Sequence, residues 1–218
     1  YRLDSIIVKN IRGIVISPFA MNATACLVAI FVNQRLLEYG GDLAVGAFGI
    51  ANRVAFIFIM INFGVNQGMQ PIAGYNYGAQ NYDRLMRVLK LAMIAGTCIT
   101  TSGFLVAEFI PHFCVRLFTS DSELTELSVN GLRIMMAAMP IVGYQMIVTN
   151  FFQSIGKAKI SIFLSLSRQL LFLVPLIGVM PLFFGVNGVW VAMPISDSFS
   201  AIFALVMMVR YMRVFKKR

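Results

Sequence analysis

Long apolar segments limit what this chain can fold into more than any other feature of its sequence. Six of them lie at residues 14–36, 43–70, 87–109, 127–152, 159–182 and 187–209, with short polar connections between them. An α-helix crosses the hydrocarbon core of a bilayer with about 20 apolar residues, whereas the strands of a membrane barrel alternate polar and apolar residues over about ten. The pattern predicts an all-α integral membrane protein in which residues 1–218 form a single lobe of six transmembrane helices.

Composition excludes the class of soluble globular proteins. Hydrophobic residues make up 59% of the 218 residues and charged residues 12%, and a soluble domain of this size has too little interior to bury so much apolar surface. The three cysteines show no CxxC or paired spacing, so we interpret them as small hydrophobic side chains. The chain begins YRLDSIIVKNIRG, without an initiator Met or the pattern of a signal peptide, and we expect it to be part of a longer protein.

Charged residues predict the orientation in the membrane. Most of the 18 basic residues belong to the ends and connections on the side of both termini, namely Arg2, Lys9, Arg12, Arg84, Arg87, Lys90, Lys157, Lys159, Arg210, Arg213, Lys216, Lys217 and Arg218. Acidic residues gather on the opposite side, at Glu38, Asp42, Glu108, Asp121, Glu123 and Glu126. The positive-inside rule therefore predicts a multi-pass protein of the cell membrane with both termini of this segment in the cytoplasm. The net charge of +9 then indicates contact with anionic lipid heads, and we expect no nucleic-acid partner.

A stripe of amide side chains marks the end of the second apolar segment. Asn62, Asn66 and Gln70 are spaced four residues apart and share one helix face. Pro71 follows them, and because proline cannot donate a backbone hydrogen bond, we expect the helix to bend or loosen there. Such amides could simply join helices through hydrogen bonds worth about 0.6 kcal/mol each. A helix broken beside a run of amides also predicts the lining of a substrate cavity.

The fourth apolar segment repeats this arrangement. Pro140 is a second candidate helix break, and Gln145, Thr149 and Gln153 follow at four-residue spacing, with Asn150 beside them. We expect these side chains to line the same cavity.

The polar connection HFCVRLFTSDSELTEL, which precedes that segment, carries a helix start signal. Thr119, Ser120 or Asp121 could cap a helix whose first turn is acidic. We therefore expect a helix to begin in this connection.

Three charged residues lie near the middle of predicted membrane helices: Arg53, Arg168 and Asp197. A charge at this depth costs at least a few kcal/mol, so each should be paired or line water. One interpretation of Asp197 is a carboxylate that Arg168, Arg53 or the hydroxyls of Ser196 and Ser200 neutralise, so that it joins helices. The other is a group that responds to a proton or a cation during function.

Four strings of the sequence, in this order, carry a family resemblance: GMQPIAGYNYGA, LFTSDSEL, FFQSIGKAKISIFLSLSRQ and GVNGVWVAMPISD. In combination they resemble the C-terminal half, helices seven to twelve, of a multidrug and toxic-compound extrusion (MATE) family transporter. The resemblance covers essentially the whole chain. It implies a twelve-helix protein of two six-helix lobes, in which the partner of this lobe is the N-terminal lobe of the same protein.

The resemblance also implies the activity, which is the export of amphipathic, often cationic drugs in exchange for Na+ or H+. Some sodium-coupled members carry acidic residues in the seventh or tenth helix, where this chain has amides: Asn22, Asn33, Gln34, Gln145, Asn150 and Gln153. Other members carry the coupling carboxylate on the first helix, which this chain lacks. We therefore expect the site of the coupling ion in the other half, and no cofactor.

Two other functions can be weighed from the residues. A flippase for lipid-linked oligosaccharides of the same two-lobe plan should carry several cationic residues in its cavity, and only Arg53 and Arg168 qualify here. A membrane-embedded enzyme would need a nucleophile with a base, or a metal cluster. With one histidine and no GxSxG, HExxH or nucleotide-binding GxxxxGK[ST] motif, we expect no catalytic residues and no metal site.

Overall fold

The computed structural model describes the backbone of residues 5–215 and the side chains of residues 22–212. Over this part of the chain the structure is helical and contains no strand, which confirms the predicted all-α class. The elements are α1 (Ser5–Gly78), α2 (Tyr82–Phe109), α3 (Pro111–Arg116), α4 (Ser122–Met136), α5 (Met139–Ser154), α6 (Ala158–Leu166), the π-helix η1 (Ser167–Leu173), α7 (Val174–Phe184) and α8 (Val186–Phe215).

Gly41 divides α1 into two arms, which we call the N-arm (5–40) and the C-arm (42–78). Its backbone has φ 66° and ψ −168°, a conformation open to glycine because it lacks a Cβ atom. Gly40 lies against the side chain of Val186, with no space for a Cβ atom. The first two apolar segments of the sequence are therefore antiparallel arms joined by a tight glycine turn.

The described helices offer enough apolar length for a multi-pass membrane protein. Four helical stretches are long and apolar enough to cross a membrane, at 22–78, 82–109, 158–184 and 186–212. The pair α4 and α5, which is bent by 50°, is long and apolar enough when taken together. Because the first of the four stretches is divided at Gly41, each apolar segment of the sequence lies within its own helical stretch.

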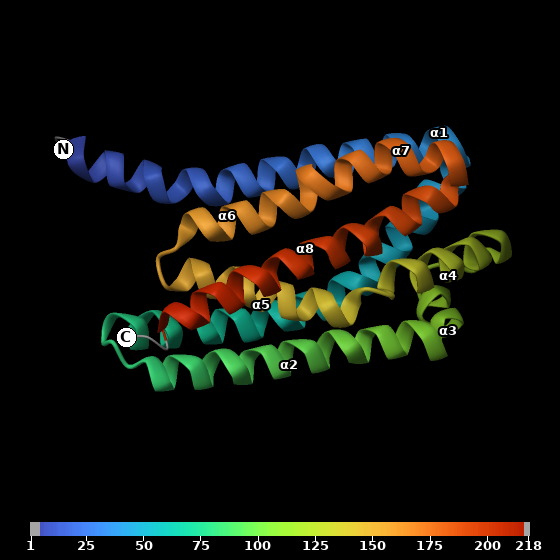
Figure 1. Ribbon diagram of the computed structural model, residues 1–218. Helices are drawn as coiled ribbons and strands as arrows, with labels where there is room; N and C mark the ends of the chain where they lie inside the picture. Colours follow the sequence, from blue (N-terminus) through green and yellow to red (C-terminus); the bar gives the residue numbers. More distant parts are fainter. Residues whose placement is uncertain (1–4, 216–218) are drawn as a thin grey trace, which may run out of the picture.

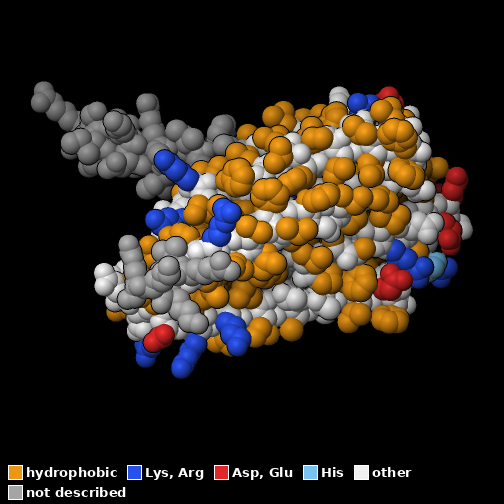
Figure 2. Space-filling model, viewed as in Figure 1, with side chains coloured by type: hydrophobic (Ala, Val, Ile, Leu, Met, Phe, Trp, Pro, Cys, Tyr) orange, Lys and Arg blue, Asp and Glu red, His pale blue; other side chains and the backbone are white. Residues whose placement is uncertain are grey.

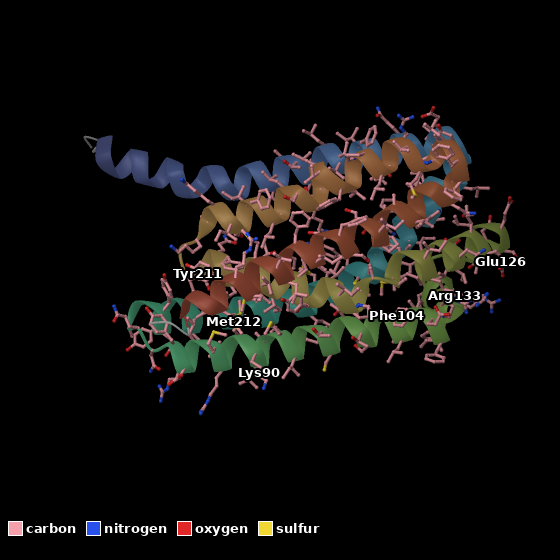
Figure 3. The ribbon with its side chains drawn as sticks, viewed as in Figure 1. Lys90, Phe104, Glu126, Arg133, Tyr211 and Met212 are labelled. Atoms are coloured by element: carbon pink, nitrogen blue, oxygen red, sulfur yellow. The ribbon has the colours of Figure 1, made fainter. Side chains whose placement is uncertain are left out.

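The helices form one bundle whose long axes run in roughly the same direction (Figure 1). The N-arm lies beside α6, η1 and α7, and α2 runs along the opposite side of the bundle next to α5 and the C-arm. The start of α1 and the end of α8 lie at the same end (Figure 1). Glu126 and Arg133 mark the other end, and Tyr211 and Met212 lie near the first (Figure 3).

Two apolar clusters hold the bundle together. One surrounds Trp190, which is 1% exposed and whose indole ring lies directly on Gly131 of α4. The other surrounds Phe151 and Phe152 of α5, both 0% exposed. In contrast, leucine and phenylalanine cover much of the outer surface, and charged side chains gather at its two ends (Figure 2). An apolar surface between charged ends is typical of a protein surrounded by lipid.

The structure corrects one of the two predicted helix breaks. Apart from Gly41, α1 has no non-helical backbone angles, so the helix continues through Pro71 without the expected interruption. A break does occur between α4 and α5, and Pro140 lies in the first turn of α5 just after it. Proline is well tolerated there, because the first backbone N–H groups of a helix have no partner within it.

The helix start predicted in the polar connection is confirmed. Asp121 caps α4, and its side chain accepts a hydrogen bond of 3.0 Å from the backbone N–H of Leu124. The side chain of Thr119 also accepts a bond from the backbone N–H of Asp121.

Candidate functional site

The candidate site is built around a cavity in the middle of the lobe, which we call the main cavity. It has a volume of about 290 Å³ and lies among both arms of α1, α4, α5, η1 and α8. Its walls are mostly apolar, with three methionines (Met135, Met139, Met193) and several alanines and valines. The polar side chains that reach it are those of Asn52, Arg168, Gln169 and Asp197.

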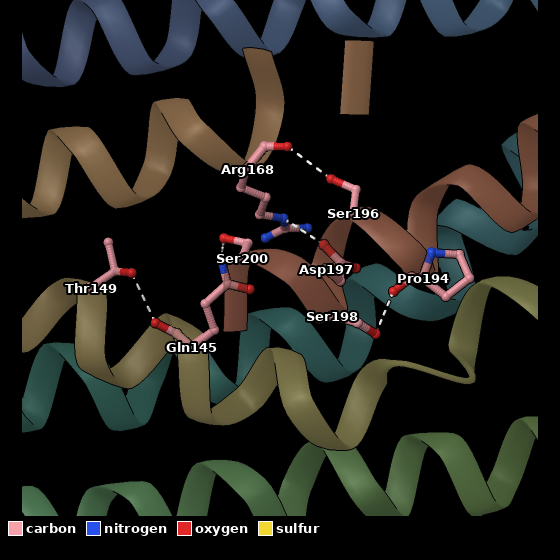
Figure 4. Close-up of polar contacts among 8 residues, drawn as sticks. All are labelled: Gln145, Thr149, Arg168, Pro194, Ser196, Asp197, Ser198 and Ser200. Carbon is pink, nitrogen blue, oxygen red and sulfur yellow. Dashed lines mark hydrogen bonds and ion pairs between the residues drawn. The ribbon is translucent and has the colours of Figure 1, made fainter. Parts of the chain in front are cut away.

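An ion pair forms one wall of the main cavity. Arg168 Nε of η1 lies 2.7 Å from Asp197 Oδ1 of α8 (Figure 4). The side chains are 34% and 13% exposed, so the pair is largely withdrawn from the surface. The hydroxyl of Ser196 donates to the backbone carbonyl of Arg168 at 2.9 Å, which joins the two helices a second time. An opposite charge at this distance compensates much of the cost of placing each charge inside a membrane protein.

The predicted third member of this charged group lies elsewhere. Arg53 is exposed on the C-arm and is not part of the Arg168–Asp197 pair, although its neighbour Asn52 lines the main cavity. The hydroxyl of Ser200, a second suggested partner of Asp197, instead accepts a hydrogen bond from the side chain of Gln145. Of the suggested partners of Asp197, the structure therefore selects Arg168.

A second cavity, of about 210 Å³, adjoins η1 at Arg168 and Gln169, and we call it the amide cavity. It contains the predicted side chains of α5, namely Gln145, Thr149, Asn150 and Gln153, together with Phe63, Met146, Ser165, Arg168 and Gln169. The four-residue spacing on α5 thus brings these side chains into one cavity, as expected of one face of a helix.

The stripe on the C-arm does not reach either cavity. Asn62 and Asn66 are 0% and 1% exposed and lie within the packing of the C-arm against its neighbours. Asn62 Nδ2 contacts the sulfur of Met146 at 3.6 Å, and Asn66 Nδ2 donates to the backbone carbonyl of Asn62 at 3.1 Å. Gln70 donates to Asn150 Oδ1 at 3.3 Å. The stripe thus lines neither of these two cavities, and its side chains contact α5 or the preceding turn of their own helix.

Sequence reasoning missed several residues of the site. Gln169 lines both cavities, and Asn52 lines the main cavity. Asn52 and Gln169 directly adjoin the arginines that the sequence singled out. The π-helix η1 that positions Arg168 and Gln169 has no signal in the residue pattern, although such helices occur frequently at functional sites.

The residues described offer no metal site. They include no group of three or more His, Cys, Asp or Glu side chains placed to hold a metal ion. What the site can do chemically follows from a mostly apolar cavity, a paired carboxylate and a set of neutral amides.

Comparison with known proteins places the chain in a family. The family model described as MatE matches residues 14–177. The multidrug export protein MepA of Staphylococcus aureus strain N315 is 25% identical over 197 residues, which cover 90% of this chain and 43% of that protein. The corresponding protein of Staphylococcus haemolyticus is 23% identical over the same length. The chain therefore spans somewhat less than half the length of these relatives.

Solved structures show the same relationship. The MATE multidrug transporter DinF-BH, solved in complex with a ligand, is 36% identical and superimposes with a TM-score of 0.85, over 98% of this chain and 48% of that one. A MATE structure in complex with MaL6 superimposes with a TM-score of 0.90 over 100% of this chain and 50% of that one, at 20% identity. This second likeness concerns the fold alone. Since the family model covers most of the chain and the fold agrees throughout, the chain belongs to the MatE family and forms about half of a MATE protein.

Proposed function

We propose that this chain is the C-terminal lobe of a secondary transporter that exports amphipathic, often cationic drugs in exchange for Na+ or H+. The observation that carries the proposal is the main cavity, a mostly apolar, partly open cavity with the Arg168–Asp197 pair in its wall. The names of the relatives support it, since MepA is a multidrug export protein and DinF-BH a multidrug transporter.

The walls of the main cavity suit ligands that differ in shape. Met135, Met139 and Met193 have flexible, polarisable side chains that can repack around different apolar bodies. Asp197 offers a negative charge to a cationic substrate, which must compete with Arg168 for it. Competition of this kind links ligand binding to the contact between η1 and α8, because displacing Arg168 opens that contact.

Alternating access requires a second lobe and two states of the protein. The N-terminal six-helix lobe of the same protein is the proposed partner, and the coupling ion has its proposed site there. Within this lobe, the 50° break between α4 and α5 supplies a point of bending, with Pro140 in the turn that follows.

The proposed orientation places both termini of the segment in the cytoplasm. Basic side chains dominate the end of the bundle where α8 finishes, and acidic side chains gather at the opposite end (Figure 2). This asymmetry supports the orientation through the positive-inside rule.

Export of lipid-linked oligosaccharides fits the cavity less well. Among the described residues that line the main cavity, Arg168 is the one basic side chain, and it is already paired with Asp197. Since Arg53 lies outside the cavity, little free positive charge remains there to hold a pyrophosphate.

The experiment that tests the proposal uses the complete protein in liposomes and follows export of ethidium under an imposed Na+ or H+ gradient. Ala29→Phe introduces a ring into the main cavity, whereas Ile30→Phe changes the next residue, which is 57% exposed and lies outside the cavity. We expect the first variant to lose export and the second to keep it. Absence of export by the wild-type protein under both gradients would contradict the proposal, and so would equal export by both variants.

A further inference from the structure

The two cavities meet at a shared wall. Arg168 and Gln169, which are neighbours on η1, line both cavities, and no other residue of the described chain does so. Asp197 lines only the main cavity. Whatever enters the amide cavity is therefore separated from Asp197 by these two side chains.

The amide cavity deepens along α5. Gln153 is exposed, Thr149 and Asn150 are half-buried, and Gln145 is 3% exposed. These residues occupy successive turns of the helix, so the cavity has its mouth at Gln153 and its floor at Gln145. The mouth lies close to the connection at Lys157, at the same end of the bundle as the end of α8 (Figure 1).

Donor groups in this cavity are already used by the protein. The hydroxyl of Thr149 donates to the backbone carbonyl of Gln145 at 2.9 Å, and Asn150 Nδ2 donates to that of Met146 at 2.8 Å. Gln145 Nε2 donates to the hydroxyl of Ser200 (Figure 4). Each of these three side chains therefore uses a donor within the protein, and Asn150 Oδ1 also accepts from Gln70.

Two residues that line this cavity, one on α5 and one on η1, each have a buried side-chain oxygen without a partner. Oε1 of Gln145 and Oε1 of Gln169 accept no hydrogen bond from any described residue. A buried polar atom without a partner costs on the order of 1–3 kcal/mol. Both residues line the amide cavity, whose volume of about 210 Å³ admits several water molecules at ~30 Å³ each.

We propose that the amide cavity is filled with water, opens at Gln153 and ends at Gln169 and Arg168. Water then reaches the Arg168–Asp197 pair from one side of the membrane, past the side chains of Gln169 and Arg168. Water is the ligand that fits, because most of the residues that line this cavity are polar and water carries no charge beside Arg168. The proposal concerns access of water alone and does not depend on which substrate or ion the protein carries.

Cysteine labelling of the complete protein in membrane vesicles tests the path. The native Cys26, Cys98 and Cys114 are first replaced by alanine, and single cysteines are introduced as Thr149→Cys or Ser165→Cys, both inside the amide cavity. Lys159→Cys marks the side of the membrane on which the mouth lies. Phe163→Cys is the matched control, since Phe163 is 47% exposed and lies on α6 outside the cavity.

The reagent is the small, membrane-impermeant cation trimethylammonium-ethyl methanethiosulfonate, applied without substrate or gradient. We expect both cavity cysteines to react from the side that labels Lys159→Cys, and about tenfold or more faster than Phe163→Cys, because only a hydrated thiol ionises readily. Ser165→Cys is nearly isosteric, so it remains informative if Thr149→Cys fails to fold. Reaction no faster than that of Phe163→Cys, or reaction only from the opposite side, would overturn the proposal.

A second comparison tests the wall. Met193→Cys places a thiol in the main cavity. Gln169→Ala removes part of the wall that the two cavities share, whereas Ser165→Ala enlarges the amide cavity and leaves that wall unchanged. We expect Gln169→Ala to accelerate labelling of Met193→Cys from the side of Lys159, and Ser165→Ala to leave it unchanged. Equal rates in all three backgrounds would overturn the role of Gln169. Export is not measured in either test, so failure here is distinct from failure of the proposed transport function.

Discussion

Arg168 and Asp197 lie on different helices, yet their side chains meet at 2.7 Å beside the main cavity. Ser196, the residue before Asp197, holds the backbone of Arg168 through its hydroxyl. Two contacts thus join η1 to α8. One is the ionic contact between the side chains of Arg168 and Asp197, and the other is the hydrogen bond from Ser196 to the backbone of Arg168.

Removing one member of the pair should destabilise the protein. Asp197→Ala leaves the Arg168 guanidinium without its counter-charge, and breaking a buried pair typically costs about 3–5 kcal/mol. Because Arg168 is 34% exposed, we expect a smaller loss of about 2–3 kcal/mol. The double variant Arg168→Leu with Asp197→Ala should recover part of this loss. Thermal unfolding of the complete protein in detergent measures both, and a double variant less stable than Asp197→Ala would contradict the account.

Close contact between α2 and α5 should depend on Gly143. A Cβ atom there would collide with the hydroxyl of Thr100 and with the backbone carbonyl of Gly96, which cannot move aside as a flexible side chain can. We expect Gly143→Ala to lower the free energy of unfolding by about 1–3 kcal/mol. Gly178→Ala is the matched control, since nothing within 4 Å meets its Cβ, and it should be neutral or slightly stabilising. A stable Gly143→Ala variant would refute the contact.

The cap of α4 should contribute a measurable amount of stability. Asp121→Ala removes the acceptor of the Leu124 N–H, and loss of such a cap costs about 1 kcal/mol. Asp121→Asn keeps an acceptor oxygen at the same position and should retain most of the stability. Equal melting temperatures of the wild type and the alanine variant would show that the bond contributes nothing.

The two prolines should respond differently to replacement by alanine. Pro71 lies inside the continuous C-arm, where proline is less favourable than alanine by about 3 kcal/mol. Pro140 lies in the first turn of α5, where proline costs little. We therefore expect Pro71→Ala to raise the melting temperature more than Pro140→Ala does. A larger rise in melting temperature for Pro140→Ala than for Pro71→Ala would contradict this expectation. It would indicate that the lobe bends at Pro71 and not at the break before Pro140.

The sequence predicted the all-α class and a helix cap at Thr119, Ser120 or Asp121 because both depend on local pattern and hydropathy. It also included Arg168 among the partners of Asp197, since an intramembrane carboxylate requires a counter-charge. It could not tell that Asn62 and Asn66 are buried against neighbouring helices while Gln145 and Thr149 turn toward a cavity. Four-residue spacing defines a face of one helix, but the position of that face depends on the neighbouring helices. The π-helix that brings Gln169 between two cavities likewise depends on tertiary packing.

The central claim is that Asp197 takes part in transport, and export of ethidium by the complete protein in liposomes tests it most directly. Wild type is compared with Asp197→Asn under an imposed Na+ or H+ gradient. Ser198→Ala is the control, since Ser198 lies on the same helix, donates to the carbonyl of Pro194 and lines neither the main nor the amide cavity. At equal incorporation, and at a temperature at which all variants remain folded, we predict that Asp197→Asn slows export by about tenfold or more, which corresponds to ~1.4 kcal/mol, while Ser198→Ala exports as wild type. Export by Asp197→Asn at the wild-type rate would contradict the claim and leave the ion pair with a structural role only.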